Sequence, residues 1–399
     1  MWEPQSRSLS RDEAAGRRAL IHLDSGLTAP ARPALLGREK GIAAMTYTPV
    51  RPDALLPPVR INLYSDTQTR PTPEMKAAMV AAEVGDEQHG DDPTVHALCD
   101  RMAALLGKQA AVFLPSGTMC NQIAILTHCR PGDEIIAHET AHIVTSEGGG
   151  PAALTGASVL GLKGPRGQFD AGTLRAAFRE KRRNSPPQTL VEVEQTANIG
   201  GGSVWPQDRL NAVLDAAHEQ GMATHMDGAR LMNAVVAAGL PAAEMVARCD
   251  SVWVDFTKGL GAPLGAVLCG GADFIDMAWR WKQRLGGSMR QAGICAAACL
   301  YALDHNIDRL AEDHANAKAL ARGLAQIQGI TVEEPETNLV FFDTAGTGLT
   351  ADELARRIRK DGVMLSTMGR TRARACTHLD VDLAGIEAAV QVIRSAVTA

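Results

Sequence analysis

The sequence predicts an α/β protein with a large domain built on a mainly parallel sheet and a small α+β domain at the C-terminal end. Between about residues 60 and 300, short apolar runs alternate with longer amphipathic segments, an order that puts helices on both faces of a parallel sheet. Beyond that point the pattern changes to helices mixed with short alternating strands. We therefore expect an N-terminal arm and a large domain over 46–305, and a small domain over 306–399.

Six runs of the large domain are predicted as strands because each is short and apolar and is bounded by turn residues. They cover residues 110–114, 134–138, 189–196, 222–227, 251–256 and 265–271. Amphipathic segments between them predict helices over 94–106, 119–128, 207–220 and 241–248. Ligands of open parallel sheets lie beyond the carboxyl ends of the strands, so the residues that follow these strands are candidate site residues.

The C-terminal part begins with two predicted helices, over 290–305 and 307–328. The small domain is then expected to contain "ITVEEPETNLVFFD", a helix at 350–361, the strand "GVMLST" and the alternating segment "RARACTHLD". A last helix is predicted from apolar residues on one face, namely Leu383, Ile386, Ala389, Val390, Ile393 and Val397.

Composition argues against several classes of protein. With 40 Lys and Arg against 45 Asp and Glu, there is no basic excess of the kind that nucleic-acid binders carry. No run approaches the roughly 18 apolar residues of a membrane helix. The eight cysteines are scattered without a CxxC pair, which argues against a zinc site or a disulfide framework. We expect a cytoplasmic protein with reduced thiols, no metal, and no nucleic-acid or membrane partner.

The first 45 residues differ in character from the rest and predict a disordered leader. They contain no apolar stretch of the secretory type, and acidic residues such as Glu3 and Asp12 argue against an organelle transit peptide. Met45 would be a plausible alternative start.

The segment "FLPSGTMCNQ" (113–122) leads from a strand through a turn of small residues into a helix. Gly117 and Thr118 would lie at the helix N-terminus, where unpaired N–H groups and the helix dipole favour a phosphate. The alternative is an ordinary strand–turn–helix with Thr118 near the cap.

Two further strands end in charged residues. In "THMDGAR", Asp227 ends a strand and Arg230 follows it. Either the two form a structural pair, or Asp227 faces the ring nitrogen of a pyridine cofactor and Arg230 binds a substrate carboxylate. In "DFTKGLGAPLG", Lys258 follows an apolar strand, where lost hydration favours a neutral amine that forms a Schiff base. The alternative for Lys258 is an ordinary surface lysine.

These three elements, in this order, resemble the aspartate-aminotransferase-like superfamily of pyridoxal-phosphate enzymes, and in detail the threonine aldolases of the β-eliminating-lyase group. The resemblance runs from about residue 60 to the C-terminus. It rests on segments that include "INLYSDTQTRPTPEM", "GDEQHGDDPTVHAL", "LPSGTMCNQIAILTHCRPGDEII", "AHIVTSEGGG", "MDGARLMNAVVA", "TKGLGAPLGAVL", "GGSMRQAG", "TNLVFF" and "THLDV".

The resemblance implies roles for the residues of a pyridoxal 5'-phosphate site. Lys258 would form the Schiff base with the cofactor, Asp227 would hold the pyridinium nitrogen, and Gly117 with Thr118 would bind the phosphate. His142 would stack on the ring, and it is the first candidate for the base that takes the β-hydroxyl proton, with a bound water as the alternative.

The resemblance also implies a substrate, an activity and an assembly. Ser65, Arg230 and Arg374 would bind the carboxylate of an amino acid such as L-threonine or L-allo-threonine, which is cleaved to glycine and an aldehyde. One rival is a lyase that eliminates a β-substituent from another amino acid. A second is a non-catalytic sensor domain, for which the leader is too short to supply a DNA-binding module. The expected assembly is a homotetramer, a dimer of dimers, in which the apolar helix 290–305 forms either an interface or core.

The chain departs from the family pattern at several positions near the expected substrate β-substituent or cofactor phosphate. His89 stands where bacterial members have a tyrosine, and Ala197 stands where they have a histidine. Gln283 replaces an expected basic residue, and "NSPPQT" replaces a segment that contains histidine. Arg290 either reaches a phosphate or caps its own segment. These differences leave the preferred aldehyde and the threo/erythro preference open.

Overall fold

The computed structural model describes residue 49 and residues 55–398, so the predicted leader lies outside the described residues. Residues 54–399 form one compact unit by their contacts. It contains two sheets, each with its own hydrophobic core. The α/β class with a mostly parallel sheet and a small separate sheet is therefore confirmed, while the boundary near residue 305 stays a prediction.

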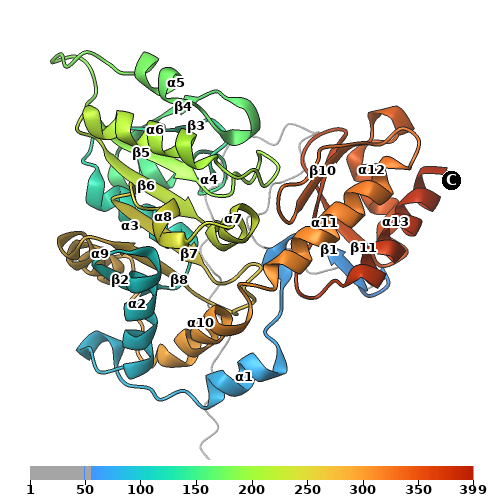
Figure 1. The fold of residues 1–399 in the computed structure, drawn as a ribbon, viewed down its shortest axis with the longest axis horizontal. Helices are drawn as coiled ribbons and strands as arrows, with labels where there is room; N and C mark the ends of the chain where they lie inside the picture. The colour runs from blue at the N-terminus through green and yellow to red at the C-terminus, as the bar shows by residue number, and fades with distance from the viewer. Residues whose placement is uncertain (1–48, 50–54, 399) are drawn as a thin grey trace, which may run out of the picture. The chain divides into compact units, whose positions relative to one another are not determined.

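The larger sheet has seven strands in the order β2-β8-β7-β6-β5-β3-β4 (Figure 1). Their bounds are β2 Ala110–Leu114, β8 Ala266–Gly270, β7 Ser251–Asp255, β6 Ala223–Gly228, β5 Gln188–Glu194, β3 Glu134–His138 and β4 Ser158–Leu162. Only β8 runs antiparallel to its neighbours. The six predicted strands of this sheet are thus all present, and β4 is the one that was not predicted. It is an edge strand with only one buried residue, and Gly161 interrupts its short apolar run.

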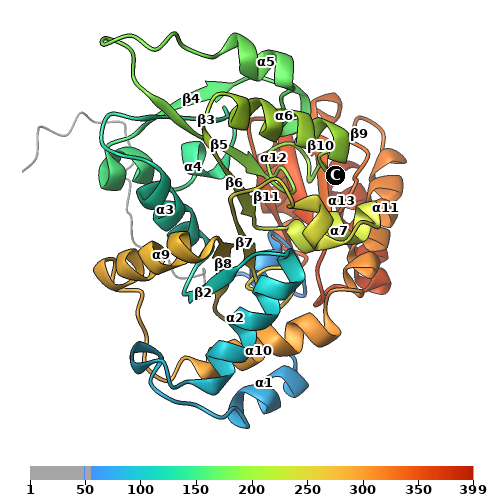
Figure 2. The same cartoon turned by 60° about the vertical axis from the view of Figure 1, so that its left-hand side comes forward.

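Helices cover both faces of this sheet. Along β5, Val193 belongs to the same core as Leu210 of α6, whereas Leu190 on the opposite face belongs to a core with Ile125 of α3. Figure 2 shows α3 and α6 on opposite sides of the strands. The helices of this part are α1 Pro73–Val80, α2 Pro93–Leu106, α3 Gly117–His128, α4 His142–Thr145, α5 Ala171–Ala176, α6 Gln207–Glu219, α7 Leu231–Ala238, α8 Ala242–Met245, α9 Ala272–Arg284 and α10 Gly293–His305.

The smaller sheet has five strands in the order β1-β11-β12-β10-β9. They are β1 Ile61–Leu63, β11 Val363–Thr367, β12 Arg372–Cys376, β10 Leu339–Asp343 and β9 Thr331–Val332, and α11 Leu310–Ala325, α12 Ala351–Arg359 and α13 Leu383–Thr398 complete this part. Although the sequence pattern grouped β1 with the large domain, β1 pairs in parallel with β11. A strand of three residues is too short for its periodicity to indicate a partner.

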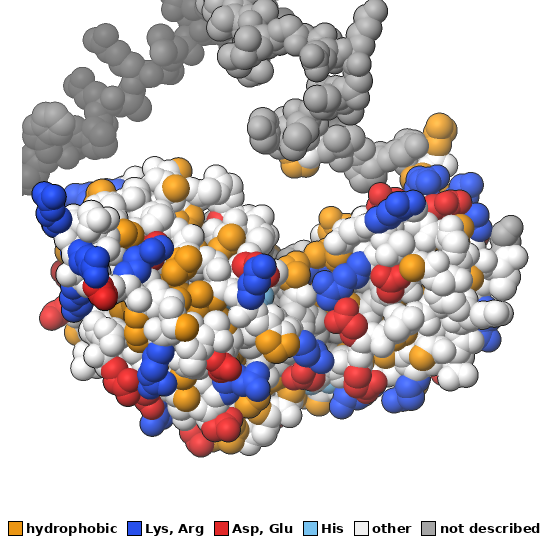
Figure 3. All heavy atoms as spheres, turned by 90° about the horizontal axis from the view of Figure 1, so that it is seen from above, with side chains coloured by type: hydrophobic (Ala, Val, Ile, Leu, Met, Phe, Trp, Pro, Cys, Tyr) orange, Lys and Arg blue, Asp and Glu red, His pale blue; other side chains and the backbone are white. Residues whose placement is uncertain are grey.

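The described residues also show how charges, apolar helices and cysteines are distributed. On the face seen in Figure 3, Lys and Arg side chains are interspersed with Asp and Glu. Among the described residues, no helix is both long and apolar enough to cross a membrane. All eight cysteines lie in the described part of the chain and are free thiols.

Candidate active site

Every residue that the sequence predicted for the site lines one cavity. Its volume is about 310 Å³, and it lies at the carboxyl ends of β5, β6 and β7. The predicted residues that line it are Ser65, Gly117, Thr118, His142, Asp227, Arg230, Lys258 and Arg374. Parallel strands end at the same edge of a sheet, which is why residues more than a hundred positions apart meet here.

The start of α3 forms one end of the cavity. Ser116 is the N-cap, and its Oγ accepts a hydrogen bond of 3.3 Å from the backbone N–H of Met119. Thr118 is the second residue of α3, so it lies near the cap, and the alternative of an ordinary strand–turn–helix stays open. A Cβ at Gly117 would overlap the Trp253 ring, so only glycine allows the helix to start this close to β7. The remaining N–H groups of the first turn are available to an anion.

Asp227 is the penultimate residue of β6 and is 1% exposed. Its Oδ2 accepts a hydrogen bond of 2.8 Å from Nδ2 of Asn121, and its Oδ1 accepts one of 3.0 Å from the backbone N–H of Ala229. Burial raises the pKa of this carboxyl, while His142, the Asn121 amide and Lys258 act in the opposite direction. The alternative that Asp227 and Arg230 form a structural pair is wrong, because each has other partners.

His142 begins α4 beside Asp227. Its Nδ1 lies 2.8 Å from Oε1 of Glu147, whose side chain is fully buried while that of His142 is 36% exposed. This hydrogen bond raises the pKa of His142, and burial opposes it. An imidazole that is partly open to the cavity and held by a carboxylate can exchange a proton near neutral pH.

Lys258 follows β7 and faces the same cavity. Its Nζ lies 2.6 Å from Oδ2 of Asp255, and its side chain is 18% exposed. The ammonium group also lies 5.7 Å from the centre of the Trp253 ring. The alternative of a surface lysine is therefore wrong.

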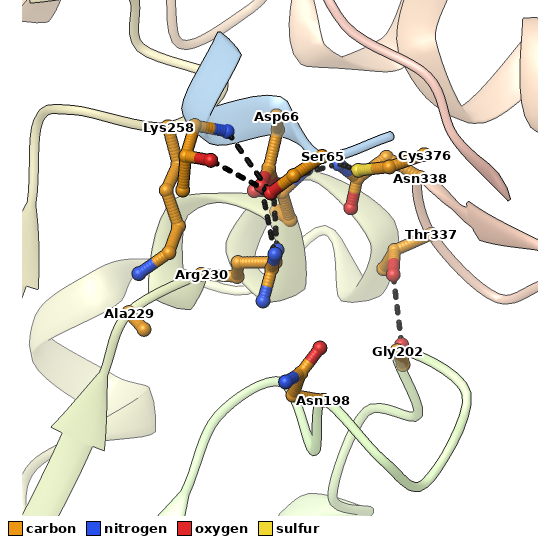
Figure 4. A network of polar contacts seen from close by, with 12 residues as sticks. Ser65, Asp66, Asn198, Gly202, Ala229, Arg230, Lys258, Thr337, Asn338 and Cys376 are labelled. Carbon is orange, nitrogen blue, oxygen red and sulfur yellow. Dashed lines mark hydrogen bonds and ion pairs between the residues drawn. The ribbon is translucent and has the colours of Figure 1, made fainter. Parts of the chain in front are cut away.

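Arg230 forms a buried ion pair with Asp66. Its Nε and Nη2 donate to the two carboxylate oxygens at 2.7 Å each, with side-chain exposures of 4% and 0% (Figure 4). Burial by itself raises the pKa of Asp66, but the Arg230 charge holds that pKa well below its usual range. Burial likewise acts to lower the pKa of Arg230, and the Asp66 charge raises it above its ordinary value. One guanidinium nitrogen, Nη1, takes no part in this pair.

Arg374 lies on β12, in the smaller sheet. Its nitrogens donate to three neutral oxygens: Oδ1 of Asn198 at 2.9 Å, Oγ of Ser366 at 3.2 Å and the carbonyl of Tyr64 at 3.4 Å. Burial, followed by the Arg230 charge, lowers the pKa of Arg374. Ser65 lies near the end of β1, and its Oγ accepts from the backbone N–H and hydroxyl of Thr67.

The positions at which the chain departs from the family pattern do not line this cavity. Ala197 is buried in a β-bridge with Ser203. His89 is exposed in a short 3₁₀ helix. Arg290 donates from Nη1 to Oδ2 of Asp86 at 2.7 Å, and its backbone carbonyl accepts from the N–H of Glu87. These contacts join its segment to residues 86–87, and both roles expected for Arg290 stay predictions.

Sequence reasoning missed the partners that hold the predicted residues in place. These partners are Asp66, Asn121, Glu147, Asn198 and Asp255. Some signals were available: Asp255 ends an apolar strand three residues before Lys258, and Glu147 follows His142 by five residues before a glycine run. Asp66 is adjacent to Ser65, but nothing in the pattern connects it to Arg230.

Comparisons with known proteins identify the class. The family model described as beta-eliminating lyase matches residues 62–347. The chain is 40% identical over 325 residues to low-specificity L-threonine aldolase 1 of Arabidopsis thaliana, covering 80% of this chain and 91% of that protein. It is 41% identical over 329 residues to the low specificity L-threonine aldolase of Escherichia coli strain K12, covering 80% and 94%.

Solved structures have the same fold. A threonine aldolase of Leishmania major matches with a TM-score of 0.74 at 22% identity, covering 84% of this chain and 99% of that one. A putative L-allo-threonine aldolase of Listeria monocytogenes matches with a TM-score of 0.71 at 24% identity, covering 85% and 96%. The family model and the two relatives identify a lyase, and the solved structures share its α/β fold. The chain belongs to the beta-eliminating lyase family, which confirms the resemblance seen in the sequence.

Proposed function

We propose that this protein is a pyridoxal-5'-phosphate-dependent aldolase that cleaves L-threonine, L-allo-threonine and related β-hydroxy-α-amino acids into glycine and an aldehyde. The observation that carries the proposal is the convergence of eight predicted residues on one cavity of about 310 Å³. Relatives about 40% identical that are called low-specificity L-threonine aldolases support the substrate class.

The residues around the cavity fit the proposed cofactor. The N-terminus of α3 offers N–H groups to a phosphate, and the buried carboxylate of Asp227 suits a protonated ring nitrogen. The amine of Lys258 is the group that would bond to the cofactor aldehyde, and His142 would lie against the ring. When bound, the cofactor supplies the electron sink that a carbanion at Cα requires.

The chain's own residues would bind and orient the amino acid. Arg374, with Nη1 of Arg230 and the hydroxyl of Ser65, would hold the α-carboxylate. A carboxylate fixed at this end of the cavity determines where the β-hydroxyl points, because both groups belong to one small molecule. Specificity for the aldehyde side chain would then depend on the remaining space in the cavity.

His142 is the proposed base for the β-hydroxyl proton. Glu147 engages Nδ1, so Nε2 is the ring nitrogen that remains for the substrate. Proton transfer to a positioned imidazole typically contributes about 10²- to 10⁴-fold to a rate. Replacing His142 with Phe keeps a ring but no proton acceptor, and unchanged turnover in that variant would assign the role to water.

A product assay decides between cleavage and elimination. The purified protein is incubated with pyridoxal 5'-phosphate and L-threonine, and glycine, acetaldehyde, ammonia and 2-keto acid are measured. Glycine with acetaldehyde is expected, whereas ammonia with a 2-keto acid would establish the β-eliminating alternative. A visible absorption band should appear with the cofactor, vanish in Lys258→Ala, and remain in the control Lys163→Ala, which removes an exposed lysine.

We also propose a cytoplasmic homotetramer. Eight free thiols are consistent with a reducing compartment, and the exposed Ile294 at the start of α10 offers apolar surface for subunit contacts. Light scattering on the purified protein measures the mass in solution, and a monomer would overturn the assembly.

A further inference from the structure

A fully buried carboxylate, that of Glu147, lies behind His142 and is enclosed by N–H donors. Its Oε1 is 2.8 Å from Nδ1 of His142 and accepts a bond of 2.7 Å from Nδ2 of Asn121. Its Oε2 accepts a bond of 2.5 Å from Nε2 of Gln122. Two amide groups thus donate to Glu147, one to each oxygen, so both of its oxygens act as hydrogen-bond acceptors.

The orientation of Asn121 is determined by an independent contact. The Trp253 indole nitrogen can only donate, and it lies 2.6 Å from Oδ1 of Asn121. The Nδ2 group of Asn121 must therefore face the two carboxylates, where it bridges Glu147 and Asp227. A single amide thus couples the carboxylate behind His142 to the carboxylate at the end of β6.

This arrangement determines where His142 carries its proton. A carboxylate that accepts from every neighbour leaves Nδ1 to be the donor, so Nδ1 is protonated in both the neutral ring and the cation. The lone pair of the neutral ring is then on Nε2. The other acidic groups that face His142 are Asp227 of β6 and Glu194 of β5, and burial raises the pKa of Glu194 to about 8.

We propose that Glu147 is the positioning residue that prepares His142 for proton transfer, an inference that rests on the proposed aldolase function. In the transfer, the β-hydroxyl O–H bond breaks and an N–H bond forms at Nε2. The O–H electron pair becomes the second carbonyl bond of the aldehyde as the Cα–Cβ bond breaks, and the electrons of that bond stay with the glycine fragment. Glu147 compensates the imidazolium charge and keeps Nδ1–H oriented, without itself taking the proton.

The test compares Glu147→Gln with a matched control, Glu134→Gln, in the protein loaded with pyridoxal 5'-phosphate. Glu134 is also a largely buried carboxylate, but its partners Arg179 and Gln188 lie away from the cavity. In Glu147→Gln, kcat for L-threonine should fall about tenfold or more with little change in KM, since proton transfer rather than binding is impaired. The acidic limb of the kcat profile should move to lower pH, because His142 loses the charge that raises its pKa.

A spectroscopic readout separates this inference from the function itself. Nitrogen-15 NMR of histidine-labelled protein, with His142→Phe to assign the signal, reports the protonation of Nδ1 and its titration. The His142 titration should shift to lower pH in Glu147→Gln and stay in place in Glu134→Gln. An unshifted titration in Glu147→Gln would overturn the proposal even if the wild type cleaves threonine. A wild type that yields no glycine would overturn the function, while the NMR result would still test the contact.

A second variant, Glu147→Asp, tests the same proposal if Glu147→Gln fails to fold. Glu147→Asp keeps the charge and shortens the side chain by one methylene, so the acidic limb should remain near that of the wild type while kcat falls. Equal kcat in Glu147→Asp and the wild type would show that the position of the carboxylate has no role. If the acidic limb of the kcat profile moved equally in Glu147→Asp and Glu147→Gln, the charge of the carboxylate would have no role.

Discussion

The two walls of the cavity hold their cations in different ways. On the large-sheet wall, formed by His142, Arg230 and Lys258, each basic side chain contacts an acid: Glu147, Asp66 and Asp255, respectively. On the small-sheet wall, formed by Ser65 and Arg374, the guanidinium contacts only neutral oxygens in the described residues.

This difference indicates which arginine gains more from a substrate carboxylate. A guanidinium already neutralised by a buried carboxylate gains little charge compensation from a second anion, whereas Arg374 enters binding with its charge uncompensated. We infer that the ion pairs of the large-sheet wall fix the positions of its basic side chains before a substrate binds. Arg374 on the small-sheet wall then supplies the electrostatic attraction for the substrate carboxylate.

The largest expected effect concerns the buried ion pair of Asp66 and Arg230. Asp66→Ala leaves the Arg230 charge buried without its partner, and this should lower the free energy of unfolding by about 3–5 kcal/mol. Urea unfolding followed by circular dichroism measures it. The control Asp380→Ala removes the partner of Arg70, whose side chain is 82% exposed, and should change stability by less than about 1 kcal/mol. Equal midpoints for Asp66→Ala and the wild type would show that the pair contributes nothing.

The same pair predicts a pH dependence. The pKa of Asp66 in the folded protein lies below its ordinary value of 3.8, so the unfolded chain binds the proton more readily. The stabilisation is therefore fully present above pH 3.8 and is lost as the pH falls through the folded-state pKa. The stability difference between wild type and Asp66→Ala should narrow in strong acid.

A second prediction concerns the uncompensated arginine. Arg374→Ala should raise KM for L-threonine by about 10- to 100-fold, since hydrogen bonds to a charged group contribute roughly 1.5–3 kcal/mol. The neighbouring Arg372 on the same strand pairs with Glu333 and does not line the cavity, so Arg372→Ala serves as the control. Steady-state kinetics measures both. A normal KM in Arg374→Ala would remove the distinction between the walls.

Glu192 of the larger sheet differs from the acids that pair with His142, Arg230 and Lys258. It is fully buried on β5 with no hydrogen-bond partner on either oxygen among the described residues, and burial raises its pKa well above the ordinary 4.5. Above pH 4.5 the unfolded chain releases this proton while the folded protein keeps it, so stability falls as the pH rises from 4.5 towards the folded-state pKa. Glu192→Leu should therefore stabilise the protein by about 1–3 kcal/mol at alkaline pH, and by less in acid. Thermal melts across pH measure this difference, and the same gain at every pH would contradict it.

The smallest expected effect concerns Asn198, which accepts a hydrogen bond from Arg374 on the small-sheet wall. Asn198→Ala removes one neutral acceptor from Arg374, and the loss of one hydrogen bond of roughly 1 kcal/mol should raise KM about fivefold. The variant should leave kcat unchanged. A KM increase as large as that of Arg374→Ala would mean that Asn198, rather than the guanidinium charge, decides binding.

The sequence determined the parts of the site that follow from strand order. Asp227 and Lys258 each follow an apolar run, and Gly117 begins a helix after another such run, so the rule that parallel strands end at one edge brings them together. The same alternation predicted the larger sheet, apart from the edge strand β4. Local pattern was sufficient because each of these features is encoded within about ten neighbouring residues.

Only the tertiary structure decided the partners of these residues. Arg230 and Asp66 are 164 positions apart, and β1 pairs with a strand near the other end of the chain. Any of the 45 acidic residues could have faced a given cation as far as the sequence pattern goes. Charge compensation and pKa depend on distances of a few ångströms between segments that are remote in sequence. Such distances are set by how the two sheets and their helices pack, and no spacing along the chain encodes them.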